Sequence, residues 1–505
     1  MKKPYKIAIM QLSRVGDIMM MLPLTRALKR TYPGCHITMI VREKYKSALD
    51  LFDMINDVVT LKTQDVLQPY LENESDVQQT LDKIEGFIGE VKEKQIDWLI
   101  NLSFSPVSAD FTHAVTQNTN TSFSGYSRYP DGYIQFSDTV AEYFFNEVGT
   151  SRSNQIHLTE IFAKMTRTQL IEEDFVCPNF DCAFLPEQNS RYYTIHLGAS
   201  EEFKRAPFIV IQKSMEKIQD LDPEIAFCFI GTSDESALSV QAIASLPERL
   251  KTKCINLCGQ TNLKQLLHVM GMSYGHLGGD SLPVQLAMLS KTKVFLLSAE
   301  GTNFFETGPL TEKSIVYRFQ EDEEIQNRLP GLIHCFVTGQ QTVVSDPIFY
   351  PQLGLIKFTN FQPTSAHHKE SLHQLSCYLY FNDELPLIHD ATFVAGIQHL
   401  NESHSLVLEH IQLGIQRPEM INTLQAISRQ VDAISEEIAK YGDHLAKVCQ
   451  WIALQKSQIA PQSMDKMLKA SVLVYESILG KMIELQSLGV PMSYDNQKIT
   501  FKETS

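Results

Sequence analysis

The stretch that decides the fold is Lys6-Ile-Ala-Ile-Met-Gln-Leu-Ser-Arg-Val-Gly-Asp-Ile-Met-Met-Met-Leu-Pro23. Its mostly apolar start predicts a fully buried parallel strand, and the pattern after the loop predicts a helix that continues to about Tyr32. A strand, a tight loop and a helix open a doubly wound α/β domain, in which ligands bind beyond the carboxyl ends of the strands. Ser13, Gly16 and Asp17 are therefore predicted to lie in a functional loop.

Asp17 has two interpretations at this junction. It caps the helix by accepting backbone N–H bonds, which is the commonest role of Asp there and is favoured by spacing alone. Alternatively, it faces a cleft as a general base. Gly16 allows the backbone to turn sharply just before it.

The composition is that of an ordinary globular protein with two to four domains. Of 505 residues, 43% are hydrophobic and 20% charged. The net charge of −15 argues against nucleic-acid binding. Nine cysteines without a Cys-x-x-Cys pair argue against a zinc ribbon and are expected to be reduced thiols. With neither a signal peptide nor a run of membrane-spanning length, the expected location is cytoplasmic.

Short apolar strands alternate with helices in two series, which predicts two parallel sheets. Residues 1–170 are predicted as one Rossmann-like domain, 171–190 as a linker, 191–337 as a second such domain, and 338–505 as a mostly helical extension. The further predicted strands are 36–41, 55–61, 97–102, 192–197, 225–230, 253–257, 274–277 and 293–297.

The helical part of the extension, residues 393–488, carries apolar stripes at helical spacing. They predict either a small bundle packed on itself or a coiled coil that forms a homo-oligomer. All loops with candidate chemistry precede residue 338, so the extension is expected to be separable from ligand binding.

The second domain carries two candidate anion-binding loops. His196-Leu-Gly-Ala-Ser200 follows a predicted strand, and Lys204-Arg205 comes just after it, which suits a diphosphate as well as it suits a solvated basic turn. Gly278-Gly-Asp-Ser281 opens a helix whose N–H groups would point into the same cleft. Asp280 there either binds sugar hydroxyls or caps the helix. Together these loops describe a nucleotide-sugar site that faces the carboxylate of Asp17.

Four blocks resemble, in order and spacing, motifs of glycosyltransferase family 9, the lipopolysaccharide heptosyltransferases, over roughly residues 5–320. They are Leu12-Ser-Arg-Val-Gly-Asp-Ile with Leu22-Pro23, His196-Leu-Gly-Ala-Ser with Lys204-Arg-Ala-Pro207, Asn256-Leu-Cys-Gly-Gln-Thr-Asn-Leu263, and Gly279-Asp-Ser-Leu-Pro-Val-Gln-Leu-Ala287. The resemblance implies a GT-B fold, with two Rossmann-like domains facing a cleft. It also implies an inverting, metal-independent bacterial enzyme that transfers heptose from ADP-heptose to a lipopolysaccharide core or another surface glycan, with no cofactor beyond this nucleotide sugar.

The resemblance also assigns roles to residues. Asp17 matches the general base, Lys204 the donor-phosphate lysine and Asp280 the donor-sugar carboxylate. The other residues placed on the donor side are Ser200, Arg205, Gly279, Ser281 and Gln285. Those placed on the acceptor side are Ser13, Arg14 and Gly16.

Three positions depart from the family pattern: Leu282 stands where Gly is usual, Gln285 where His is usual, and Ala206 where Trp is usual. They would suit a catalytically silent GT-B protein, which either binds a sugar nucleotide or serves as a scaffold, whereas Asp17 and Lys204 favour an enzyme. A protein acceptor is a variant of the enzyme hypothesis, and a nucleotide-sugar epimerase is a weaker alternative. Peripheral contact with a membrane through a glycolipid acceptor is left open.

Overall fold

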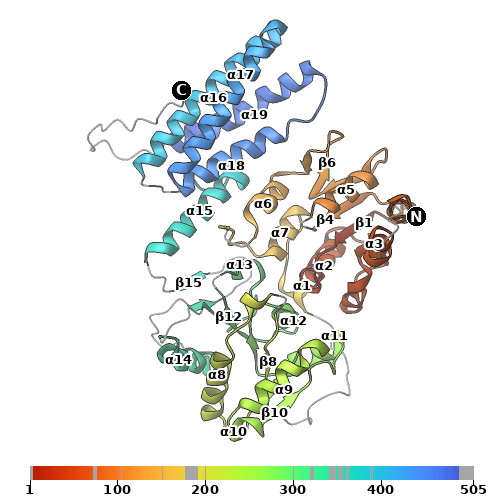
Figure 1. Ribbon diagram of the computed structural model, residues 1–505, viewed down its shortest axis with the longest axis vertical. Coiled ribbons are helices and arrows are strands. Elements are labelled where there is room, and N and C mark those ends of the chain that lie inside the picture. The colour runs from red at the N-terminus through yellow and green to blue at the C-terminus, as the bar shows by residue number, and fades with distance from the viewer. Residues whose placement is uncertain are drawn as a thin grey trace. The chain divides into compact units, whose positions relative to one another are not determined.

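The computed structural model describes residues 4–71, 77–103, 105–149, 152–176, 191–199, 201–299, 301–318, 324–339, 348–350, 357–359, 363–386, 388 and 390–487. Contacts divide the chain into two units, many of whose helices and strands are labelled in Figure 1. Unit 1 comprises Met1–Phe104, Asn118–Ser122 and Val148–Pro363, and unit 2 comprises Ser105–Gln117, Phe123–Glu147 and Thr364–Ser505. Both predicted Rossmann-like sheets therefore fall in unit 1, and the predicted domain limits remain a prediction.

The first sheet confirms the strands predicted near the N-terminus. Its strand order is β3-β2-β1-β4-β5, and β1 pairs in parallel with both β2 and β4. Ile7 and Ile9 of β1 are fully buried, as expected for a central parallel strand. The strands are β1 Lys6–Gln11, β2 His36–Arg42, β3 Asp57–Leu61, β4 Trp98–Asn101 and β5 Ser122–Ser124.

The second sheet has the order β10-β9-β8-β11-β12-β13-β14-β15. Its first six strands pair in parallel, and β14 and β15 add an antiparallel edge. Counted from β8, the parallel order is 3-2-1-4-5-6, which is the order of a classical dinucleotide-binding sheet. The strands are β8 Tyr192–His196, β9 Ala226–Phe229, β10 Cys254–Asn256, β11 His276–Gly278, β12 Val294–Ser298, β13 Ile315–Arg318, β14 Ile348–Tyr350 and β15 Lys357–Thr359.

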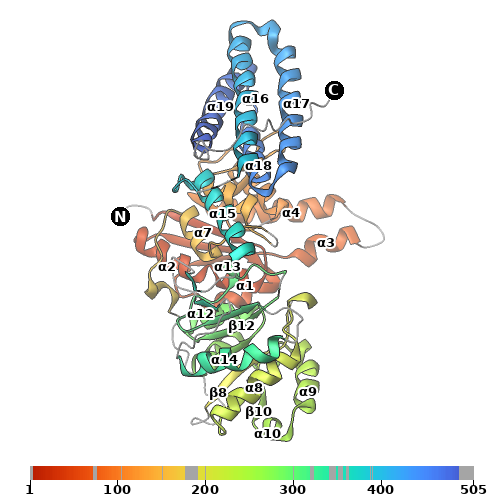
Figure 2. The ribbon, with the colours of Figure 1, turned by 90° about the vertical axis from the view of Figure 1, so that its left-hand side faces the viewer.

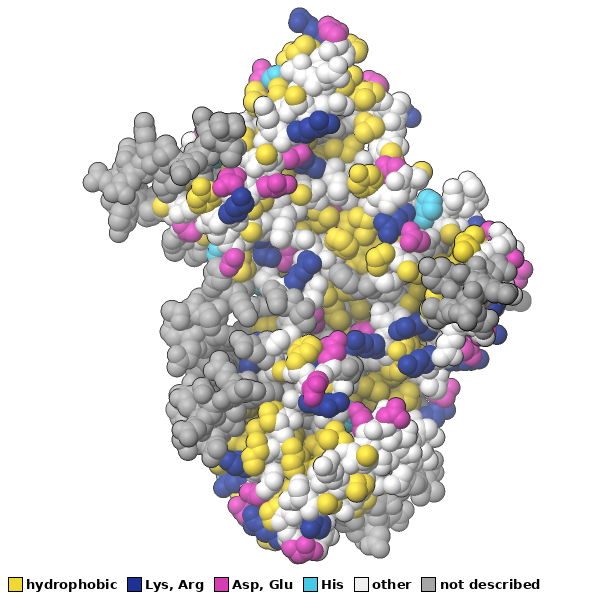
Figure 3. Space-filling model, viewed as in Figure 1, with side chains coloured by type: hydrophobic (Ala, Val, Ile, Leu, Met, Phe, Trp, Pro, Cys, Tyr) yellow, Lys and Arg dark blue, Asp and Glu magenta, His cyan; other side chains and the backbone are white. Residues whose placement is uncertain are grey.

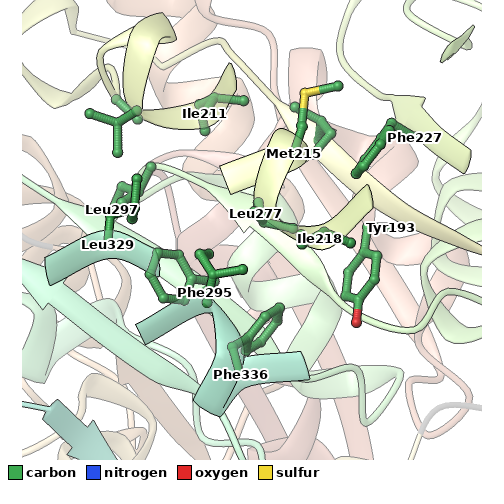
Figure 4. Close-up of a cluster of buried hydrophobic side chains, with 14 of the residues drawn as sticks. Tyr193, Ile211, Met215, Ile218, Phe227, Leu277, Phe295, Leu297, Leu329 and Phe336 are labelled. Carbon is green, nitrogen blue, oxygen red and sulfur yellow. The ribbon is translucent and has the colours of Figure 1, made fainter. Parts of the chain in front are cut away.

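Alternate residues of this sheet form one buried face (Figure 4). Phe295 and Leu297 of β12 point to the same side, since side chains two apart on a strand share a face. Met215 of α8 (Phe208–Leu221) and Phe336 of α14 (Glu324–Thr338) cover them, and all four side chains are buried. This core packs around β8 and β11, and the loops after these two strands contain residues of the candidate site.

Helices connect the strands of unit 1, as the alternating pattern predicts. Those around the first sheet are α1 Val15–Met19, α2 Leu22–Thr31, η1 Glu43–Leu51, α3 Thr63–Leu71, α4 Val77–Glu93, α7 Leu158–Met165 and η2 Glu172–Phe175. Those around the second sheet are η3 Glu202–Lys204, α8 Phe208–Leu221, η4 Ser233–Glu235, α9 Ser236–Ser245, α10 Glu248–Lys251, α11 Leu263–Gly271, α12 Leu282–Leu289, α13 Phe304–Thr307 and α14 Glu324–Thr338.

Unit 2 contains the helical C-terminal region. Helices α16 to α19 lie side by side in both ribbon views (Figures 1 and 2). Val407, Val431 and Tyr475, from α16, α17 and α19, share one buried cluster, so the predicted apolar stripes pack within one chain. The elements are α5 Pro106–Thr116, β6 Tyr126–Arg128, β7 Ile134–Phe136, α6 Thr139–Glu147, α15 Pro363–Phe381, α16 Ala391–Gln416, η5 Pro418–Met420, α17 Ile421–Ile438, η6 Ala439–Tyr441, α18 Asp443–Ser457 and α19 Met464–Gln486.

Within the described residues, we find no helix with the length and apolar character that a membrane crossing needs. On the face shown in Figure 3, basic side chains lie among acidic ones.

Glu142 of α6 makes the stability of unit 2 depend on pH. Burial raises its pKa from 4.5 to about 7, although Gln455 Nε2 donates a hydrogen bond of 2.7 Å to its carboxyl. Because the pKa of Glu142 is higher in the folded chain than in the unfolded chain, its contribution to stability is fully present below pH 4.5. This contribution is lost as the pH rises through about 7, where the buried carboxyl ionises. We expect Glu142→Gln to raise the free energy of unfolding at pH 8 by about 2 kcal/mol and to leave it nearly unchanged at pH 4.5. Urea unfolding of the full chain at both pH values measures this, with the exposed Glu409→Gln as control. A variant that shows the same pH dependence as the wild type would contradict the prediction.

Candidate functional site

Three loops that carry predicted site residues begin where the strand order reverses. In the first sheet the reversal lies between β1 and β4, and the loop after β1 leads to Asp17. In the second sheet it lies between β8 and β11, whose following loops lead to Lys204 and to Ser281. Ligands of doubly wound sheets bind at such switch points. The topology therefore supports the position predicted for the site.

Asp17 lies in the first turn of α1, three positions after the N-cap residue Arg14, so it is not itself the predicted N-cap residue. Its Oδ2 accepts a hydrogen bond of 3.0 Å from the backbone N–H of Arg14. Burial raises the pKa of Asp17, while the Arg14 hydrogen bond and the charges of Arg14 and Lys204 oppose this rise. A carboxylate with a raised pKa is a better proton acceptor than an ordinary Asp. The capping contact and a role as base are thus compatible.

Asp280 is the second desolvated carboxyl of the site. Both of its oxygens lie 2.9 Å from the hydroxyl of Thr307. Burial raises the pKa of Asp280, the Thr307 hydrogen bond and the Lys204 charge lower it, and the charge of Asp17 raises it further. Asp17, Asp280 and Lys204 therefore lie within electrostatic reach of one another. The structure brings together the three residues to which the motifs assign the main roles.

The start of α12 is packed closely against these loops. A Cβ atom on Gly279 would lie 2.6 Å from the carbonyl oxygen of Lys204, so only glycine fits there. A Cβ atom on Gly16, which lies in α1 and not in the loop before it, would lie 3.9 Å from Cγ of Gln285, so α1 lies beside α12. Gln285 Nε2 donates to the carbonyl of Thr307 at 2.5 Å, and its buried Oε1 has no hydrogen-bond partner among the described residues. Gln285 therefore holds, in the described part of the chain, an unpaired acceptor oxygen at the start of α12.

Ser281 is the N-cap residue of α12. It belongs to a hydrogen-bond network with His196 and Glu235. Its hydroxyl lies 2.9 Å from Nδ1 of His196, and Nε2 of His196 lies 3.3 Å from Oε2 of Glu235. Burial disfavours the charge on Glu235, but hydrogen bonds from His196 and Thr232 outweigh it and lower the pKa of Glu235 to about 2. His196 and Glu235 lie 39 positions apart, and the motifs did not assign a role to either side chain. This network fixes the side chains around the N-terminus of α12.

Lys204 meets a carboxylate that the sequence analysis did not single out. Glu201 Oε2 lies 3.1 Å from Lys204 Nζ, and Glu201 Oε1 lies 3.2 Å from Arg14 NH2. Arg205 is exposed, and Ser200 lies outside the described residues. The carbonyl of Ser13 accepts a hydrogen bond of 3.0 Å from Arg42. Arg14 is thus the predicted acceptor-side residue that reaches the Lys204 loop.

In the ranges that the structure describes, no group of three or more His, Cys, Asp or Glu side chains has the geometry of a metal site. The seven cysteines described are free thiols: Cys35, Cys228, Cys254, Cys258, Cys335, Cys377 and Cys449. The arrangement offers two half-buried carboxyl groups, a lysine and the start of a helix. These groups are able to take a proton from one reactant and stabilise negative charge on another.

Comparison with known proteins identifies a family for part of the chain. Residues 86–330 match the model of glycosyltransferase family 9 (heptosyltransferase). This part of the chain is a family 9 glycosyltransferase domain. The match confirms the predicted family and enzyme class, and it includes the loops that carry Lys204 and Asp280. The loop with Asp17 precedes the matched range.

Several solved structures are similar to about two thirds of this chain. A family 9 glycosyl transferase from Veillonella parvula is 16% identical, with a TM-score of 0.48 and coverage of 65% of this chain and 90% of that one. E. coli ADP-heptose lipopolysaccharide heptosyltransferase II is 17% identical, with a TM-score of 0.46 and coverage of 66% and 99%. E. coli heptosyltransferase WaaC with ADP is 15% identical, with a TM-score of 0.48 and the same coverage. A search of curated proteins found no match.

Proposed function

We propose that this chain is an inverting, metal-independent heptosyltransferase that uses ADP-heptose as donor and a lipopolysaccharide core or another surface glycan as acceptor. The observation that carries the proposal is the meeting of Asp17, Lys204 and Asp280 at the switch points of two parallel sheets. The match to a family described as heptosyltransferases supports the choice of sugar. The inverting course and the independence from metal rest on the motif resemblance.

In the proposed reaction, Asp17 is the general base. It takes the proton of the acceptor hydroxyl as this oxygen attacks the anomeric carbon from the face opposite the diphosphate. Partial desolvation raises its proton affinity, and the Arg14 N–H holds one carboxylate oxygen in place. The other oxygen, Oδ1, is then the atom that receives the proton.

The leaving diphosphate gains negative charge as the glycosidic bond breaks. Lys204 and the N–H groups at the start of α12 are the proposed partners of this charge. Asp280, oriented by Thr307, and the buried Oε1 of Gln285 are the proposed acceptors for sugar hydroxyls. Gln285 cannot carry a proton as His does, so its proposed role is recognition.

Thermal unfolding with nucleotide sugars tests the proposed donor site. A ligand that binds only the folded state stabilises it by about 2.7 kcal/mol at a concentration of 100 times its Kd. We expect ADP-sugars to raise the melting temperature of the wild type, and Lys204→Ala to lose this shift because the diphosphate loses its cation. The panel contains ADP-, UDP-, GDP- and CMP-sugars.

Lys217→Ala on α8 removes the same charge elsewhere in the domain and is expected to keep the full shift. A shift with UDP-sugars alone would replace the proposed donor. The absence of any shift would favour the silent scaffold, for which Leu282 and Ala206 are the motif departures.

A further inference from the structure

Glu201 bridges the two cations that flank the proposed diphosphate position. One carboxylate oxygen lies 3.1 Å from Lys204 Nζ, and the other lies 3.2 Å from Arg14 NH2. Arg14 follows β1 of the first sheet, whereas Glu201 and Lys204 follow β8 of the second. The bridge therefore joins the loops that carry the proposed base and the proposed phosphate lysine.

In this bridge, the Glu201 carboxylate is the anion that Lys204 and Arg14 bind. Arg and Lys donate charge-assisted hydrogen bonds to carboxylate and phosphate oxygens alike, so the two anions compete for the same donors. The hydrogen bond from Lys204 is the largest cause that lowers the pKa of Glu201, followed by the hydrogen bond from Arg14, so Glu201 is held as a carboxylate. It thus places a negative charge where a ligand phosphate would bind Lys204.

The bridge is also exchangeable. The side chains of Arg14, Glu201 and Lys204 are 54%, 38% and 19% exposed, respectively. Ion pairs at this level of exposure contribute little net free energy, because water and salt screen them. A diphosphate with more negative charge and more acceptor oxygens is therefore able to displace the Glu201 carboxylate.

We infer that Glu201 is an internal competitor of the donor diphosphate: it holds Lys204 and Arg14 in the ligand-free protein and is displaced when the diphosphate binds. This inference rests on the proposed function, since it assumes that Lys204 receives the diphosphate. The backbone N–H of Arg14 also holds Asp17. Displacement of Glu201 thus changes the partner of the residue that positions the proposed base.

Isothermal titration of ADP and of inorganic pyrophosphate tests the inference. Glu201→Gln removes the competing charge, so we expect it to tighten the binding of both ligands about threefold to tenfold. Adenosine, which lacks phosphate, is expected to bind both proteins equally. Glu202→Gln is the matched control: Glu202 is exposed, adjacent in sequence, and without an ion pair in the part of the chain that the structure describes. It is expected to change either Kd by less than about twofold.

The outcomes separate this inference from the proposed function. If the wild type binds ADP, Lys204→Ala abolishes binding and Glu201→Gln leaves the Kd unchanged or weaker, the proposed function stands and the internal competitor is wrong. Equal tightening by Glu201→Gln and Glu202→Gln also overturns it, because the effect would then be one of net charge. Binding that appears only in Glu201→Gln supports it most strongly. If no variant binds either ligand, both proposals fail.

Discussion

Replacing Asp17 with asparagine is expected to lower the turnover number about 10²-fold to 10⁴-fold while leaving nucleotide binding intact. The asparagine would still accept the Arg14 N–H through its side-chain oxygen, but it cannot take a proton from the acceptor hydroxyl. Release of nucleoside diphosphate, measured with the donor that the thermal panel selects and a glycan acceptor, reports the turnover. Asp50→Asn on η1 exchanges an exposed carboxyl for an amide and is expected to keep full activity.

The pH profile gives the same prediction a second measurement. A general base works only when ionised, so activity is lost as the pH falls through the pKa of Asp17. Burial raises this pKa, and the acid limb is therefore expected above the usual range of an Asp side chain. The raised pKa also means that the ionised form destabilises the fold, so the Asp17→Asn variant is expected to melt no lower than the wild type at pH 7. A variant that keeps more than a tenth of the turnover would exclude Asp17 as the base.

The fold was largely predictable because parallel strands are buried on both faces and appear as continuous apolar runs. The runs at β1 and β2 have no competing interpretation, and their predicted bounds differ from the structure by at most one residue. By contrast, Tyr274 was predicted to begin β11 but is exposed, and the strand begins at His276. The grouping of Ser105–Gln117 and Phe123–Glu147 with the C-terminal helices in unit 2 was not predicted, because no local pattern reports contacts between distant segments.

The site was predicted in the parts that follow from strand ends. Lys204 and Asp280 follow strands of one sheet, so their neighbourhood depends on topology alone. The Arg14–Glu201 contact joins positions 187 apart, and a sequence without an alignment has no signal for such a pair. Thr307 was missed for the same reason. The sequence alone did not decide whether Asp17 caps the helix or acts as a base. Desolvation raises the pKa of Asp17, and only the structure shows that the side chain is desolvated.

Replacing Lys447 with methionine is expected to lower the free energy of unfolding of unit 2 by about 3–5 kcal/mol. Lys447 of α18 forms an ion pair with Glu147 of α6, and their side chains are only 10% and 1% exposed. Ser376 Oγ of α15 also donates to Glu147, at 3.0 Å. Without the lysine, the Glu147 charge would stay buried without its counter-ion. Urea unfolding of the full chain, with hydrogen exchange of α6, α15 and α18, measures the loss.

A double variant shows whether the cost comes from the unpaired charge. Glu147→Gln with Lys447→Met removes both charges, and the new amide would still accept the Ser376 hydrogen bond, so most of the lost stability is expected to return. Lys469→Met serves as the exposed control, since Lys469 and Asp465 are each 64% exposed and their pair is worth about 0.5 kcal/mol or less. A loss below about 1 kcal/mol in Lys447→Met would contradict the prediction.

The same variant tests the predicted separability of the C-terminal extension from donor binding. A truncation near residue 340 would remove Lys447 and Ser376 together and leave Glu147 without either partner, so failure to fold would say nothing about the donor site. Lys447→Met weakens unit 2 but keeps the whole chain. If it lowers the unfolding midpoint of unit 2 and the nucleotide-induced shift of unit 1 persists, donor binding does not depend on the stability of the extension. Loss of both together would show that the helical region supports the donor site.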